Sequence, residues 1–168
     1  RRGPGAVQVS EETFEVVAKG LQLAKMTKGA FDPTVQPLME FWGFHGTTRE
    51  AWPTPEELLV VQEKVGFEKV QPVRSLDGRL TVDAGGTALD LSAIAKGFAV
   101  DKLSGVLVER GHDRHLVEVG GEVMARGTSL RGGGWILGVD KPVKGSLPGT
   151  DYAAIFELTD AAMATSGN

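Results

Sequence analysis

The sequence predicts an α+β fold, a single domain of helices packed on a mostly antiparallel sheet. The first reason is the order of the patterns: helical periodicity comes first, a hairpin pattern follows, and short strand patterns come after one further helix. The second reason is that strands and helices do not alternate, as they would in a parallel sheet. The third is composition, because 41% hydrophobic and 24% charged residues are typical of a chain that buries a core.

We expect this domain to span residues 1–168 and to be incomplete at both ends. The chain starts at Arg1 without an initiator Met. It stops on Thr165-Ser166-Gly167-Asn168, a segment that is typical of the start of a turn. A signal peptide or lipid anchor would then precede Arg1.

Three helices are expected in the first part of the chain, over residues 11–28, 32–41 and 55–65. Ser10 is a suitable N-cap for the first helix, and acidic residues fill its first turn, where the helix dipole favours negative charge. Asp32 precedes a proline and can cap the second helix. Thr54 and Glu57 have the spacing of a capping box for the third helix, which Gly66 ends.

One further helix and seven strands are expected in the rest of the chain. Ser92 caps the helix, which reaches about Glu109. Asp77-Gly78 is a hairpin signal between the first two strands. His112 and His115 are expected to be exposed in the turn after the helix. The strands are expected over residues 67–73, 79–83, 115–119, 122–126, 135–140, 153–158 and 162–164.

Composition excludes several classes of protein and of site. Cysteine is absent, which excludes disulfides, thiolate metal sites and a cysteine nucleophile. With 18 basic and 22 acidic residues the formal net charge is -4, so we expect no nucleic-acid partner, because phosphate neutralisation needs an excess of positive charge. No run of about 18 apolar residues occurs, so no membrane-spanning helix is predicted.

Ala30-Phe31-Asp32 is the first segment with the composition of a ligand site. A small residue lets the backbone approach a ligand, an aromatic ring can stack on a flat heterocycle, and a carboxylate can accept from a ring N–H or a hydroxyl. The same residues also fit a structural role, in which Phe31 belongs to the core and Asp32 caps the next helix. The residues alone leave both interpretations open.

Asp90 and Lys96 lie on either side of the start of the helix that Ser92 caps. The free N–H groups and positive dipole end of a helix N-terminus favour an anion such as a phosphate. Lys96 falls in the first turn, where the dipole disfavours a cation, and a bound phosphate would remove that conflict. In the alternative interpretation, Asp90 or Ser92 only caps the helix and Lys96 is solvated.

Glu118 and Glu122 flank Gly120-Gly121 within a strand pattern. The two glycines indicate a bulge or a close approach of the backbone to a ligand, and the two carboxylates are candidates for acid–base chemistry or for a metal. A bulge between surface glutamates is the structural alternative. At the end of the chain, Thr165-Ser166-Gly167-Asn168 can form an anion-binding nest or merely a turn.

Five segments of the sequence together carry a family resemblance. They are Ala30-Phe31-Asp32-Pro33-Thr34-Val35 with Pro37-Leu38 and Trp42-Gly43-Phe44, then residues 90–101, 117–122, 135–139 and 164–168. In this order they resemble the FAD:protein FMN transferases, the ApbE flavin transferase family. Each motif is weak alone, whereas five in the same order are specific, and they extend over nearly the whole chain.

This resemblance implies an enzyme that binds FAD and Mg²⁺ and transfers FMN from FAD to a Thr or Ser hydroxyl of a partner protein, releasing AMP. It implies that Ala93 binds the metal through its backbone carbonyl, an oxygen ligand of the type that Mg²⁺ prefers. The residues that it implies for FAD binding are Ala30, Phe31, Asp32, Asp90 and Lys96.

Parts of the family pattern are missing from this sequence. They are an N-terminal Met-Gly-Thr strand, a His-x-x-Asp-Pro segment with its base, and an Asp/Thr cluster that completes the metal site. We therefore expect residues 1–168 to hold only part of the active site, and the resemblance assigns no catalytic residue within them.

The resemblance leaves three functions open: flavin transfer, hydrolysis of FAD to FMN and AMP, and FAD binding without catalysis. It implies an acceptor protein with a Thr or Ser flavinylation site, such as a subunit of a membrane redox complex. It also implies a place on the periplasmic or cell-envelope side, with a lipid anchor in the full-length protein.

Overall fold

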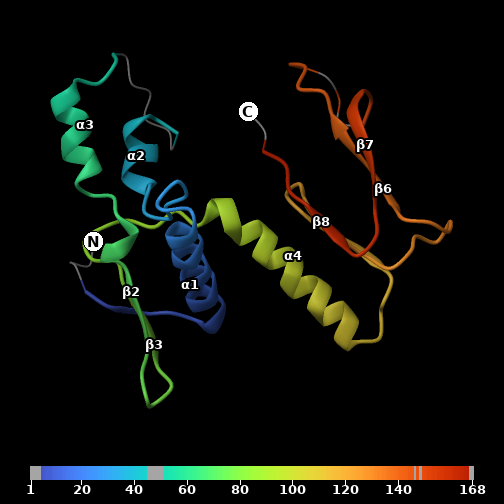
Figure 1. Ribbon diagram of the computed structural model, residues 1–168, viewed down its shortest axis with the longest axis horizontal. Helices are drawn as coiled ribbons and strands as arrows, with labels where there is room; N and C mark the ends of the chain where they lie inside the picture. The colour runs from blue at the N-terminus through green and yellow to red at the C-terminus, as the bar shows by residue number, and fades with distance from the viewer. Residues whose placement is uncertain (1–4, 45–50, 146, 148, 167–168) are drawn as a thin grey trace. The chain divides into compact units, whose positions relative to one another are not determined.

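The computed structural model describes residues 5–44, 51–145, 147 and 149–166. The chain divides into two compact units, Arg1–Ile94 and Ala95–Asn168. Helices and antiparallel sheets make up the described chain, so the predicted α+β class is confirmed (Figure 1). The expectation of a single domain over residues 1–168 stays a prediction. None of the described helices is long and apolar enough to cross a membrane.

In the first unit, a long helix packs on a three-stranded antiparallel sheet of order β1-β3-β2. Val17 and Leu21 of the helix meet Val70 and Val82 in the buried core. The spacing of four residues places Val17 and Leu21 on one face of the helix, which is why both are buried. The elements are α1 (Glu11–Met26), β1 (Val7–Gln8), β2 (Gln71–Arg74) and β3 (Leu80–Asp83).

The local signals around α1 and the β2–β3 hairpin act as predicted. The side chain of Ser10 caps α1 by accepting from the N–H of Thr13. Lys28 and Gly29 take φ values of +54° and +82° after α1, and this left-handed pair ends the helix. Gly78 takes φ +83° in the turn between β2 and β3. The short strand β1 was not predicted.

Two short helices and a 3₁₀ helix complete the first unit. They are α2 (Gln36–Phe41), α3 (Pro55–Gln62) and η1 (Phe67–Lys69). The predicted capping box is present in α3, because Thr54 Oγ1 accepts from the N–H of Glu57 and the Glu57 carboxylate accepts from the N–H of Thr54. The strand expected over 67–73 is wrong in its first half, which forms η1 before β2 begins at Gln71.

The start predicted for α2 was wrong. We expected Asp32 to cap a helix over 32–41, but α2 begins at Gln36 and has no side-chain cap. The carboxylate of Asp32 accepts instead from Thr34 and from the N–H of Phe67. The Asp32 carboxylate, which local spacing assigned to the N-terminus of the helix, is therefore bonded in part to Phe67, a residue distant in the sequence.

Helix α4 (Ser92–Glu109) runs from the first unit into the second, which contains two antiparallel sheets. One sheet has the order β4-β5-β8 and the other pairs β6 with β7. The strands are β4 (His115–Val119), β5 (Glu122–Arg126), β6 (Trp135–Asp140), β7 (Tyr152–Leu158) and β8 (Ala161–Met163). These bounds agree with the predicted strands to within one residue at each end.

His115 is buried between α4 and β4, so the expectation that it is exposed was wrong. Only 7% of its surface is exposed, and its Nε2 lies 2.8 Å from Ser104 Oγ of α4. Its Nδ1 lies 2.8 Å from the carbonyl oxygen of His112. A carbonyl can only accept, so Nδ1 is the donor in its contact with His112.

Gly85 and Gly86 provide a test of the turn that follows β3. A Cβ on Gly85 would lie 2.2 Å from the carbonyl oxygen of Lys69, whereas one on Gly86 meets nothing within 4 Å. Both have positive φ. We expect Gly86→Ala to cost about 1 kcal/mol of folding free energy from backbone strain alone. Gly85→Ala should cost about 1–3 kcal/mol more, because rigid backbone must move. Urea denaturation of both variants measures the difference, and equal costs would contradict the close approach.

Candidate functional site

The loop formed by residues 30–34, here the 30–34 loop, is fixed by the carboxylate of Asp32. Oδ1 of Asp32 accepts from the N–H of Thr34 at 2.8 Å and from its hydroxyl at 2.6 Å. Oδ2 accepts from the N–H of Phe67 at 3.2 Å. Asp32 and Phe31 are half-buried, and Ala30 is exposed. The loop therefore keeps a small residue, a ring and a carboxylate in a fixed order at the surface.

Asp90 forms a turn of the same kind beside this loop. Its Oδ1 accepts from the N–H of Ser92 at 2.9 Å and from the Ser92 hydroxyl at 2.5 Å. Its own N–H donates to the carbonyl of Pro33 at 2.8 Å. Asp90 is half-buried, as expected for a carboxylate between two leucines. The structure thus brings the predicted residues Asp32 and Asp90 into adjacent turns.

Gly20 of α1 lets the start of α4 approach the 30–34 loop. A Cβ on Gly20 would lie 3.2 Å from Ile94 Cδ1 and 3.5 Å from Cβ of Pro33. Ala93, the predicted metal ligand, precedes Ile94 and is exposed in the first turn of α4. The 30–34 loop and the start of α4 therefore belong to one region of the first unit.

The described residues offer only a small part of a magnesium site. The carbonyl oxygen of Ala93 is a ligand of the type that Mg²⁺ prefers. Among the described residues, however, no group of three or more His, Cys, Asp or Glu side chains could hold a metal ion. A magnesium ion at Ala93 would therefore depend largely on water and phosphate oxygens, or on residues outside the described ranges, for its other ligands.

Lys96 is held by groups of the second unit. Its Nζ donates to the carbonyl of Gly120 at 3.0 Å and lies 2.7 Å from Glu122 Oε2. The side chains of Lys96 and Glu122 are 45% and 15% exposed. We had expected Lys96 to be solvated or to face a ligand phosphate. The structure shows that a protein carboxylate already offsets its charge.

Gly120 and Gly121 form the two-residue turn of a β4–β5 hairpin, so the predicted bulge was wrong. Their φ values of +57° and +95° suit a turn whose twist matches that of a hairpin. A Cβ on Gly120 would lie 3.0 Å from Lys96 Cδ, and one on Gly121 would lie 3.6 Å from Thr165 Oγ1. The close approach predicted from the glycines is thus an approach to the protein's own side chains.

The predicted pairing of Glu118 with Glu122 was also wrong. The β4–β5 register places Glu118 opposite Val123 and Val119 opposite Glu122. Residues directly opposite share a face of the sheet, and successive residues of a strand alternate between faces. Glu118 and Glu122 therefore lie on opposite faces, and Glu122 is on the face that meets Lys96.

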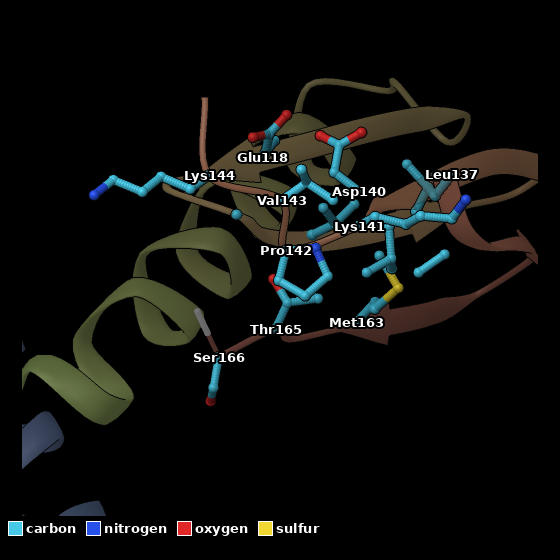
Figure 2. Close-up of a pocket in the computed structure, with 15 residues that line it drawn as sticks. Glu118, Leu137, Asp140, Lys141, Pro142, Val143, Lys144, Met163, Thr165 and Ser166 are labelled. Atoms are coloured by element: carbon cyan, nitrogen blue, oxygen red, sulfur yellow. The ribbon is translucent and has the colours of Figure 1, made fainter. Parts of the chain in front are cut away.

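A pocket of about 880 Å³ lies on the Glu118 side of this hairpin. Glu118, Gly121, Thr165 and Ser166 are among its lining residues, so it unites the two segments predicted near the end of the chain (Figure 2). Lys141 and Lys144 extend away from each other on opposite sides of the pocket (Figure 2). The last two residues of the predicted nest, 167 and 168, lie outside the described residues.

Comparison with known proteins decides the family. The model of the ApbE family matches residues 1–168. The FAD:protein FMN transferase of Haemophilus influenzae is 34% identical over 164 residues, and that of Vibrio cholerae is 36% identical over 162 residues. This chain belongs to the ApbE family. The matches cover 96% and 95% of this chain but 47% and 46% of those proteins.

Solved ApbE structures share the fold. The crystal structure of the ApbE protein from Thermotoga maritima has a TM-score of 0.77 at 32% identity and covers 97% of this chain. The flavin transferase ApbE from Vibrio cholerae has a TM-score of 0.78 at 34% identity and covers 99%. The matched parts are 51% and 52% of those chains. The chain thus spans about half the length of the ApbE proteins it matches.

Sequence reasoning did not assign Thr34, Gly66 or Phe67 to the site region. Their contacts to Asp32 and to one another close the 30–34 loop. A signal for Thr34 was present, because the spacing of Asp32 and Thr34 repeats in Asp90 and Ser92. No local pattern predicts a role for Gly66 or Phe67, because they are 32 and 35 residues away from the side chains that they bind.

The two faces of the β4–β5 hairpin can be tested with matched substitutions. Glu122→Gln removes the charge of a mostly buried carboxylate beside Lys96 and should lower the free energy of unfolding by about 1–2 kcal/mol. Glu118→Gln changes an exposed residue of the same hairpin and should stay within about 0.5 kcal/mol. Urea denaturation compares them, and a larger loss for Glu118→Gln would contradict the assignment of faces.

Proposed function

We propose that this chain is the flavin-binding part of an FAD:protein FMN transferase. The enzyme would move FMN from FAD to a Thr or Ser hydroxyl of a partner protein in the presence of Mg²⁺ and release AMP. The supporting observation is the ApbE family match over residues 1–168, with curated relatives described as FAD:protein FMN transferases. The adjacent turns of Asp32 and Asp90 agree with it, because they offer acceptor oxygens in one region.

Within this proposal the first unit binds the flavin nucleotide. The small side chain of Ala30 leaves room for a close approach, and the ring of Phe31 can stack on a flat heterocycle. The carboxylates of Asp32 and Asp90 can accept from ring N–H or hydroxyl donors. Ala30 is exposed, and Phe31, Asp32 and Asp90 are only partly buried, so a ligand can reach them.

Lys96 and Ala93 would act on the pyrophosphate. The ammonium of Lys96 has three N–H donors, of which one bonds Gly120 and a second faces Glu122, and its side chain is 45% exposed. A phosphate oxygen can therefore take the third. The carbonyl of Ala93 would hold Mg²⁺, which supplies neutralisation of phosphate charge when bound.

The proposed transfer is a displacement at the FMN phosphorus. The acceptor oxygen forms the new P–O bond, the bond to the bridging oxygen breaks, and AMP leaves with that oxygen. The hydroxyl proton goes to a base, and we assign this role to none of the described residues. The chain's own contribution is thus to bind and orient FAD.

We further propose that the acceptor is a subunit of a membrane redox complex with a flavinylated Thr or Ser. The full-length protein would act on the periplasmic or cell-envelope side, held by a lipid anchor. Both proposals rest on the family resemblance alone. Fractionation of cells that produce the full-length protein tests the location, and recovery with cytosolic markers would contradict it.

The proposed activity is tested by incubating the full-length protein with FAD, Mg²⁺ and an acceptor protein bearing a Thr or Ser site. We expect the mass of the acceptor to rise by that of FMN while AMP appears. A Thr→Ala acceptor should gain no mass. Release of free FMN and AMP without acceptor labelling would instead indicate hydrolysis, and intact FAD after long incubation would indicate a binding module.

Asp90→Asn separates a cap from a ligand contact. Asn caps a helix almost as well as Asp, so thermal stability should be kept. If the carboxylate accepts from FAD, exchanging an oxygen for an NH₂ should cost about 1–3 kcal/mol of binding, a loss of about fivefold to 150-fold. FAD titration of the full-length variant measures this.

Asp83→Asn is the matched control for Asp90→Asn. Asp83 Oδ1 accepts from the N–H of Gly85 at 2.9 Å in a turn of the same type and the same unit. We assign Asp83 no part in the site, so its FAD affinity should match the wild type. Wild-type affinity of a folded Asp90→Asn variant would remove Asp90 from the binding site.

A further inference from the structure

Thr34, the last residue of the 30–34 loop, is a fully buried polar residue. Its relative exposure is 0%, and the preceding Pro33 is also buried, whereas residues 30–32 and Val35 are exposed or half-buried. Its hydroxyl donates to Asp32 Oδ1 at 2.6 Å and accepts from the N–H of Gly66 at 2.7 Å. A hydroxyl can donate and accept at once, so it bridges a carboxylate and a backbone N–H. Burial without these two bonds would be costly.

The bridge fixes which part of the Asp32 carboxylate a ligand can use. An ionised carboxylate has about four acceptor positions, two on each oxygen. Oδ1 accepts from the N–H and from the hydroxyl of Thr34, which fills both of its positions. Among the described residues, Oδ2 accepts only from the N–H of Phe67, at 3.2 Å. These residues therefore leave one acceptor position, and it is on Oδ2.

The partners of Thr34 and Asp32 make this orientation rigid. Gly66 and Phe67 are 32 and 35 residues away from the side chains that they bind. Gly66, whose N–H donates to Thr34, has φ +144°, a conformation that L side chains rarely adopt. This position therefore favours glycine. The loop is thus bonded to the N-cap residue and to the first residue of η1.

We propose that Thr34 is a positioning residue of the flavin site. It occupies Oδ1 of Asp32 and directs the remaining acceptor position on Oδ2 toward a single donor, a ring N–H or a hydroxyl of the flavin nucleotide. Thr34 is buried and does not touch the ligand. This inference rests on the proposed function, because the donor belongs to FAD.

Substitutions of Thr34 in the full-length protein test the inference by FAD titration. Thr34→Val keeps the shape but removes the hydroxyl, and we expect the Kd for FAD to rise about tenfold, because Asp32 can then turn away from the donor. Thr34→Ser restores the hydroxyl, and we expect a Kd within about threefold of the wild type. A Kd is measured well below the melting temperature of each variant. If Thr34→Val does not fold, Thr34→Ala is measured by the same criterion.

Thr87→Val is the matched control. Thr87 is half-buried in the same unit, and its hydroxyl donates to the carbonyl of Ala84 at 2.7 Å rather than to Asp32. We expect a lower melting temperature with an unchanged Kd for FAD. Thr34→Val with a lower melting temperature and an unchanged Kd would show a merely structural role and overturn the inference. Failure of the wild-type protein to bind FAD would overturn the proposed function instead.

Discussion

The 30–34 loop contains buried polar groups that no helix or sheet can satisfy, and the carboxylate of Asp32 supplies most of what they need. It accepts three hydrogen bonds, two from Thr34 and one from Phe67. The carbonyl of Pro33 takes the N–H of Asp90. Pro33 and Thr34 are fully buried, so their own polar groups are away from water, where an unmade bond is expensive. The places of both predicted FAD segments in the first unit therefore depend on one carboxylate and one carbonyl.

The second unit depends on a different constraint, the alternation of side chains along a strand. The tight turn at Gly120 and Gly121 fixes the β4–β5 register, and the register decides that Glu122 meets Lys96 while Glu118 lines the pocket. A slip of one residue would place the two glutamates on the same face of the sheet. The two glycines are therefore a requirement of the hairpin. Because they lack a side chain, Lys96 can also lie close to Gly120, and Thr165 can lie close to Gly121.

Features with a local cause could be predicted from the sequence. The capping box of Thr54 and Glu57 acts within one turn, and the strands after α4 follow from alternation that a short window contains. The predictions that were wrong concern residues whose partners are distant in the sequence. Asp32 was assigned to a helix because its partner Phe67 is 35 residues away, and His115 was expected to be exposed because its burial needs Ser104 from α4. The adjacency of Asp32 and Asp90 was expected only from the family resemblance, since no spacing rule connects them.

Lys96 forms an ion pair with Glu122 and can still be part of an anion site, but for a different physical reason. A lysine in the first turn of a helix is disfavoured by about 0.3–1 kcal/mol, which first suggested a compensating phosphate. Glu122 supplies that compensation within the protein, so the dipole mismatch alone no longer indicates a ligand. The same contact and the Gly120 carbonyl, however, hold a flexible side chain in one place while 45% of it stays exposed. A fixed cation loses less rotamer entropy when it binds a phosphate than a free one does. The case for a phosphate at Lys96 therefore depends on preorganisation and no longer on electrostatic conflict. Glu122 and Gly120 hold the Lys96 ammonium in place before a ligand binds.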